Sequence, residues 1–164
     1  MPTWGADAQL TRVVEQHGTA LLRLAVLLTG NRHDGEDAFQ NAIVAVAQSW
    51  QRTRPRVAAA YLRRAVANEC MHLLRNRREV ATDVAFDRSF DEPRFLRYEH
   101  DQRFFALLAD LPEKQRATLV LRYFADLDDR AIGDILECSV ETVRSQASRA
   151  LAKLRESDAV NGRS

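Results

Sequence analysis

Near the C-terminus, small and basic side chains recur at a spacing that could serve DNA recognition. At about 100° per residue, the segment 140–155 places its apolar side chains on one side of a helix and its polar side chains on the other. Short side chains permit close approach to a DNA groove, and arginine can bond guanine edges or phosphate oxygens. A solvated helix in an α-bundle has the same spacing, but the tight turn before this segment and the small Gly133 favour DNA binding. The residues that would contact DNA are Thr142, Arg144, Ser145, Ser148 and Arg149.

A second basic surface is predicted on a helix that includes residues 61–75. Arg64, Asn68, Met71 and Arg75 follow one another at spacings of four, three and four, opposite the apolar side chains. The cations could neutralise phosphates while an exposed methionine and asparagine meet bases. An ordinary basic face is the alternative, and these residues alone favour that alternative.

A third surface differs in character because it is acidic and rich in amides. At helical spacing, Asp37, Gln40, Asn41, Val44 and Gln48 share one side of a segment whose other side is apolar. Such a surface should not approach DNA. It is either a solvated face or a docking surface for a basic protein partner.

Nothing in the sequence indicates an enzyme. It has no phosphate-binding loop, no HExxH motif and no glycine-rich nucleotide fingerprint, and its four histidines and two cysteines are scattered. Cys70 and Cys138 have no CxxC partner, so both are expected to be reduced and structural. We therefore expect no catalytic residue, no metal and no cofactor. No apolar run approaches the roughly 18 residues of a membrane span, and residues 1–9 lack the layout of a signal peptide, so a cytoplasmic location without membrane contact is expected.

The elements that position these surfaces are predicted to be helices, because apolar residues recur at three-and-four spacing almost throughout. The first helix would stop at Gly30. Asp34 would cap a second helix that ends near Trp50, and residues 51–57 would form a polar loop. A third helix would end in the basic run 75–78 and complete a three-helix core.

Beyond this core the periodicity lapses over residues 79–94, which are rich in acids, and then returns. Pro112 would start one helix of a second set. Asp128 would cap a short helix, and Ser139 a longer one that ends near Arg155. A short helix, a tight connection and a longer helix form a helix-turn-helix.

The sequence thus predicts an all-α fold with two small helical domains, residues 8–78 and 95–157, joined by an acidic flexible linker at 79–94. The net charge of +1 conceals an alternation of sign along the chain. Eight arginines face one glutamate over residues 51–78, seven acids face three arginines over 79–101, and four bases face one glutamate over 141–155.

Two series of motifs carry a resemblance to a known family. The first contains Leu-Leu-Arg-Leu-Ala-Val-Leu-Leu-Thr-Gly at 21–30, Glu-Asp-Ala-Phe-Gln at 36–40 and Tyr-Leu-Arg-Arg at 61–64. The second contains Leu-Pro-Glu-Lys-Gln-Arg at 111–116 and Thr-Val-Arg-Ser at 142–145. In order and spacing they are similar to regions 2 and 4 of the extracytoplasmic-function (group IV) sigma factors, sigma-70 superfamily, of the SigE-like actinobacterial type.

The resemblance implies a role for each surface. The second helix would dock on the clamp helices of core RNA polymerase through Asp37, Gln40, Asn41 and Gln48. The last helix would read the −35 element, region 4 would also grip the polymerase flap, and an anti-sigma factor could clamp the two domains together. The loop and the third helix would bind the −10 element of the melted promoter through Arg52, Arg54, Arg56, Arg64, Asn68, Met71 and Arg75.

Some positions depart from the family pattern. Glu137 stands at the helix-turn-helix turn, where glycine is frequent, so a strained or altered turn is expected. Glu141 and Gln146 could weaken phosphate attraction or shift the −35 preference. Two other functions are therefore kept beside the sigma factor hypothesis: a stand-alone helix-turn-helix regulator, and a degenerate sigma factor that acts only by binding protein.

Overall fold

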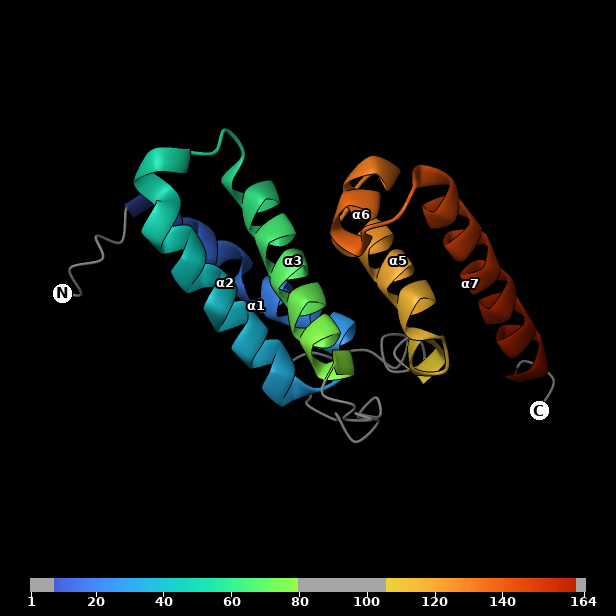
Figure 1. The fold of residues 1–164 in the computed structure, drawn as a ribbon. Coiled ribbons are helices and arrows are strands. Elements are labelled where there is room, and N and C mark those ends of the chain that lie inside the picture. The colour runs from blue at the N-terminus through green and yellow to red at the C-terminus, as the bar shows by residue number, and fades with distance from the viewer. Residues whose placement is uncertain (1–7, 80–105, 162–164) are drawn as a thin grey trace. The chain divides into compact units, whose positions relative to one another are not determined.

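The computed structural model describes residues 8–79 and 106–161, and every regular element among them is an α-helix. Two compact units result, one on each side of the predicted linker (Figure 1). The all-α prediction is confirmed for these residues. The linker beyond residue 79 and the expected helical start near Phe95 lie outside the described residues.

The first unit is a three-helix bundle of α1 (Ala8–Thr29), α2 (Arg32–Thr53) and α3 (Ala58–Glu79), in which each helix packs against the other two (Figure 1). Because every helix has two neighbours, each buries a wide apolar stripe. The predicted stop after α1 is confirmed, since Gly30 adopts φ 82°. The core includes Leu21, Leu24, Leu28, Trp50, Leu62, Val66 and Cys70.

The start of α2 differs from the prediction. Asn31, not Asp34, is the N-cap residue, and its side-chain oxygen accepts a hydrogen bond from the Asp34 N–H at 2.8 Å. Asp34 itself is only 2% exposed, and its carboxylate contacts the Asn31 amide and the guanidinium of Arg77 from α3. Both residue types cap helices well, so sequence alone could not separate them. The Asp34 carboxylate thus joins α2 to α3 through Arg77 and does not cap α2.

The end of α2 also differs. The helix continues to Thr53, and Arg54 adopts a left-handed conformation with φ 33°. The α2–α3 loop is therefore residues 54–57, shorter than the predicted loop at 51–57. As a consequence, Arg52 lies in the last helical turn of α2, where a cation interacts favourably with the helix dipole.

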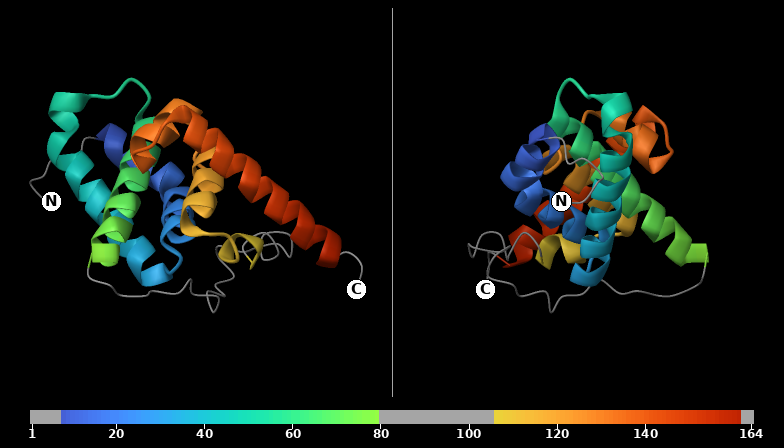
Figure 2. Two further views of the ribbon diagram at one scale, coloured as in Figure 1. Left: turned by 45° about the vertical axis from the view of Figure 1, so that its right-hand side comes forward. Right: turned by 90° about the vertical axis from the view of Figure 1, so that its left-hand side faces the viewer.

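The second unit contains α5 (Glu113–Tyr123), α6 (Asp129–Leu136) and α7 (Val140–Asn161), with residues 106–109 also helical. Pro112 lies immediately before α5, at its N-cap position. In Figure 2 the short α6 joins α7, one long helix, through a tight turn. The core includes Leu119, Val120, Leu121, Ile132, Ile135, Val143, Ala147 and Ala150.

The predicted caps of the helix-turn-helix are confirmed. Asp128 accepts a hydrogen bond from the Ala131 N–H at 2.8 Å, and the Ser139 hydroxyl accepts one from the Thr142 N–H at 3.1 Å. The predicted end of the last helix near Arg155 is wrong, because α7 continues to Asn161. The sequence after Arg155 contains no proline, and its only glycine is Gly162.

The turn between α6 and α7 keeps a shape that suits glycine although it contains Glu137. This residue has φ 57° and ψ 47°, and the Gly133 carbonyl accepts hydrogen bonds from the N–H groups of Glu137 and Cys138. A Cβ atom on Gly133 would lie 2.7 Å from the Cys138 carbonyl oxygen. Gly133 is thus required by the close approach of the turn, and the strain expected at Glu137 is present.

Candidate nucleic-acid and partner interfaces

The α7 face predicted for DNA recognition is exposed. Val143, Ala147 and Ala150 point into the core, and the five residues named for DNA contact all lie on the accessible side. The serines keep the centre of this face low, so a DNA groove could approach the helix closely. Thr142 is partly engaged already, because its hydroxyl lies 2.9 Å from the Ser139 hydroxyl in the cap of α7. Whether the face contacts DNA stays a prediction.

Arg144 on this face has a partner that sequence reasoning did not identify. Its Nε donates to the Asp129 Oδ2 over 3.3 Å, and Arg122 Nη2 donates to Oδ1 of the same carboxylate. The hydrogen bond from Arg122 lowers the pKa of Asp129 below its ordinary value, against a smaller opposing effect of desolvation. The same bond raises the pKa of Arg122. Asp129 follows the capping residue Asp128, and no spacing rule distinguishes a second aspartate that bridges two arginines.

The basic surface of α3 is present, with one correction. Arg64 and Asn68 are exposed and Arg75 is half-buried, whereas Met71 is only 4% exposed and belongs to the core. α3 packs against both α1 and α2, so its buried side is wider than the apolar residues alone suggested, and Met71 lies at the edge of that side. Met71 is therefore not available to contact a base.

Arginines also surround the α2–α3 loop. Arg52, Arg54 and Arg56 are all exposed, and Arg54 donates to the side-chain oxygen of Gln51 at 2.9 Å. The loop lies at the end of the bundle where α2 meets the start of α3, away from the junction of α1 and α2 (Figure 1). The positive charge at this end of the bundle would attract a phosphate backbone.

The acidic stripe of α2 is exposed along its whole length. Asp37, Gln40, Asn41, Val44 and Gln48 are accessible, and Val44 remains 57% exposed. The Nε2 of His33 lies 3.5 Å from the Asp37 carboxylate. A single exposed valine is ordinary on a protein surface, so the docking prediction for this stripe depends on its carboxylate and amide groups.

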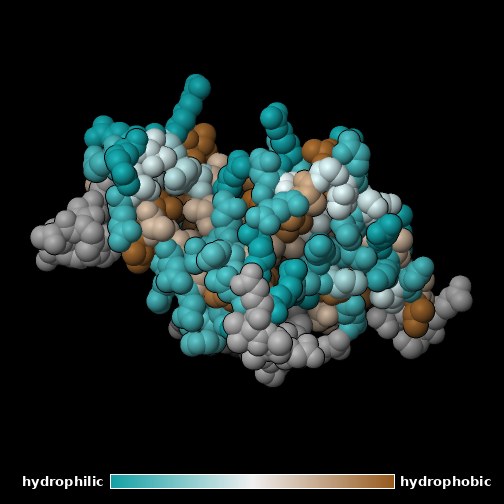
Figure 3. All heavy atoms as spheres, viewed as in Figure 1, coloured by the Kyte–Doolittle hydropathy of each residue, from teal (hydrophilic) through white to brown (hydrophobic). Residues whose placement is uncertain are grey.

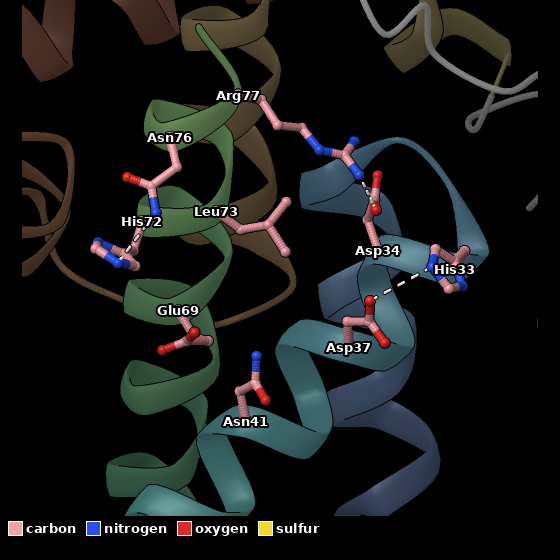
Figure 4. A pocket seen from close by; sticks show the side chains of 9 residues that line it. All are labelled: His33, Asp34, Asp37, Asn41, Glu69, His72, Leu73, Asn76 and Arg77. Carbon is pink, nitrogen blue, oxygen red and sulfur yellow. Dashed lines mark hydrogen bonds and ion pairs between the residues drawn. The ribbon is translucent and has the colours of Figure 1, made fainter. Parts of the chain in front are cut away.

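Beside this stripe, a shallow hollow of about 560 Å³ separates the start of α2 from the end of α3 (Figure 4). Asp37 and Asn41 line it from α2, and Glu69 and His72 from α3. At its upper edge in the figure the Arg77 side chain crosses from α3 to Asp34. Sequence reasoning missed this ion pair, since the two residues are 43 positions apart.

Over the described residues, the surface gives no sign of a metal centre or a membrane segment. No group of three His, Cys, Asp or Glu side chains in these residues could hold a metal ion. Nor is any helix of the described part both long and apolar enough to cross a bilayer. Polar side chains cover most of the visible face of each unit (Figure 3). The candidate sites are thus open polar surfaces.

Comparisons with known families match each unit separately. Residues 13–80 match the model described as Sigma-70 region 2, and residues 107–156 match the model described as Sigma-70, region 4. The two matches fall on the three-helix bundle and on the unit with the helix-turn-helix, in the order that the motifs predict. A helix-turn-helix acting alone would not account for the first match.

Two relatives match over nearly the whole chain. An RNA polymerase sigma-E factor of Streptomyces avermitilis is 35% identical over 93% of this chain and 86% of its own. An ECF RNA polymerase sigma factor SigE of Mycolicibacterium smegmatis is 31% identical over 95% of this chain, which spans 62% of that protein.

A solved structure shares the fold. The sigma factor RpoE from Bartonella quintana, in complex with the anti-sigma factor NepR, aligns with a TM-score of 0.70 over 90% of this chain and 95% of its own. The two sequences are 21% identical, so this likeness concerns the fold.

Proposed function

Because the chain belongs to the extracytoplasmic-function sigma factors of the sigma-70 family, we propose that it binds core RNA polymerase and directs it to promoters. The observation that carries this proposal is the pairing, in one chain, of a region 2 bundle with a region 4 helix-turn-helix. Both units expose basic surfaces. The first unit also exposes the acidic stripe of α2, which a free-standing regulator would not use.

We assign the binding of core polymerase to the acidic stripe of α2. Asp37, Gln40, Asn41 and Gln48 are exposed around Val44 and offer carboxylate and amide groups to a basic partner. In the family this helix docks on the clamp helices of the polymerase. The polymerase flap would be held by region 4.

The −10 element is assigned to the α2–α3 loop and the adjoining face of α3. Its cations can neutralise phosphates of a melted strand, and Asn68 offers an amide for a base edge. Met71 has no part in this site because it is buried. The residues assigned are Arg52, Arg54, Arg56, Arg64, Asn68 and Arg75.

The −35 element is assigned to α7. Its exposed face combines two arginines with two serines, a set that can enter a major groove and bond guanine or phosphate. The assigned residues are Thr142, Arg144, Ser145, Ser148 and Arg149.

An anti-sigma factor is proposed as a further partner. The sigma factor from Bartonella quintana that shares this fold was solved bound to one. Two small domains in one chain offer such a partner surfaces that it could mask together, which would keep the polymerase from using them.

Run-off transcription tests the proposal directly. Purified core polymerase with the full chain should initiate at discrete promoters in a pool of genomic DNA, and core alone should not. Absence of any new start site, with core binding intact, would point instead to a degenerate sigma factor.

A surface variant tests the assignment of α2. Asp37→Ala should weaken binding to core polymerase at least several-fold in a titration followed by fluorescence anisotropy. The unfolding free energy should change by less than about 0.5 kcal/mol, because the side chain is exposed. Glu141→Ala, on an exposed position of α7, is the matched control and should leave core affinity unchanged. Equal affinities for Asp37→Ala and the unaltered chain would remove the α2 stripe from the interface.

A further inference from the structure

Among the DNA-facing side chains of α7, Arg144 is joined to another helix. Its guanidinium is held by Asp129, the first residue of α6, at a distance of 3.3 Å. Arg144 is 68% exposed and Asp129 only 23% exposed. The arginine head therefore reaches the surface where DNA would lie, while its partner sits below that surface.

The Asp129 carboxylate is fixed from two sides. Oδ1 accepts from Arg122 of α5, and Oδ2 accepts from Arg144 of α7. Arg122 is 26% exposed, so this second pair is also partly shielded from water. Three helices of the second unit are thus linked through one carboxylate, and the direction of that carboxylate does not depend on Arg144.

The atom that Arg144 uses is important. Asp129 engages Nε, the donor nearest the side-chain stem, which leaves the two terminal nitrogens at the exposed end of the guanidinium. Guanine presents two acceptors, O6 and N7, and a guanidinium reads them best with two donors in one plane. We propose that Asp129 is a positioning residue that presents Arg144 to a guanine in the major groove of the −35 element. This inference rests on the proposed function.

The charges agree with this role. Two arginines and one aspartate sum to +1, so the carboxylate does not cancel the attraction of this cluster for DNA. The bond from Arg122 keeps the pKa of Asp129 low, and the carboxylate is ionised at neutral pH. A long arginine side chain loses rotamer freedom when it binds, and prior fixation by Asp129 reduces that loss. A contact to phosphate alone would need no such orientation, because phosphate oxygens accept a cation from many directions.

Selection of −35 sequences by the holoenzyme tests the inference. The unaltered chain, Asp129→Ala, Arg144→Ala and the double variant are each assembled with core polymerase and presented with promoters randomised at −35. The unaltered holoenzyme should prefer guanine at one position. Asp129→Ala should reduce that preference about tenfold and leave the other positions unchanged. The double variant should resemble Arg144→Ala alone.

Two further variants separate positioning from support of the fold. Asp128→Ala removes the cap of the same helix without touching Arg144, so it should lower stability and keep the guanine preference. Asp129→Asn keeps the size of the side chain and should also weaken the preference, since it cannot hold both arginines by charge. An unchanged selection profile for Asp129→Ala and Asp129→Asn, or an equal loss on all sequences, would overturn the inference. A holoenzyme with the unaltered chain that enriches no −35 sequence would overturn the proposed function itself.

Discussion

Replacement of Arg77 by methionine should destabilise the first unit while leaving the second unit unaffected. Arg77 carries the cation that faces the Asp34 carboxylate, and Asp34 is 2% exposed. Methionine keeps an apolar stem of similar length, so the variant removes the charge and little of the packing. After the change, the Asn31 amide is the remaining described partner of the Asp34 side chain.

The expected magnitude follows from the burial of the two groups. Breaking a fully buried ion pair by removing one partner costs about 3–5 kcal/mol, because a charge is left without compensation. Arg77 is 28% exposed, so water can reach part of the space that its head leaves. We therefore expect a loss of about 2 kcal/mol in the unfolding free energy of the first unit.

The assay can observe this unit alone. The chain has two tryptophans, Trp4 and Trp50, and Trp50 lies in the core of the first unit. In a Trp4→Phe background, urea unfolding followed by tryptophan fluorescence reports only that unit. Arg77→Lys should recover part of the loss, and Asp34→Asn combined with Arg77→Met should lose less than the sum of the two single changes. A change below about 0.5 kcal/mol for Arg77→Met would refute the view that this pair stabilises the bundle.

Other perturbations test the second unit and the buried thiol. Glu137→Gly should raise the unfolding free energy of the second unit by about 0.5–1 kcal/mol, because glycine adopts φ 57° without strain; an unchanged thermal midpoint would contradict this. Cys70 should resist alkylation in the native state, since burial raises the pKa of its thiol, whereas the half-buried Cys138 should be labelled first; equal labelling rates measured by mass spectrometry would be inconsistent with the packing. The pKa of Asp129 is lowered in the folded state, so the ionised carboxylate stabilises the fold above the ordinary carboxyl value of 3.8, and this contribution should be lost as the pH falls below that value. The unfolding free energy of Asp129→Asn, measured by circular dichroism, should therefore fall less steeply on acidification than that of the unaltered chain.

Local signals in the sequence predicted most of the fold. Asp128 and Ser139 are capping residue types that come directly before apolar repeats, and Gly30 is the glycine at the end of the first repeat. Each of these positions is decided by the chain within one helical turn, so periodicity and capping chemistry suffice. The exposed faces of α2 and α7 followed from the same periodicity.

Three features were missed because a distant contact decides the outcome, whereas the ends of α2 and α7 were each placed too early by a local reading. Asn31 and Asp34 are both good capping residues, and the arginine that recruits Asp34 lies 43 positions away. Met71 is buried because α3 has two neighbouring helices, which widens its buried side beyond what one apolar stripe indicates. Asp129 is linked to residues 7 and 15 positions away. Sequence spacing on a single helix contains none of this information.

The two missed carboxylates have a common physical role that connects fold with function. Asp34 lies one turn before Asp37 of the α2 stripe, and its partner Arg77 lies in the last turn of the helix that carries Arg64 and Asn68. The ion pair therefore ties the helix assigned to core polymerase to the helix assigned to the −10 element. Asp129 joins α5 and α6 to the helix assigned to the −35 element in the same way. In both units a shielded aspartate fixes the orientation of a binding helix, so its loss should impair partner recognition even where the contact surface is unchanged.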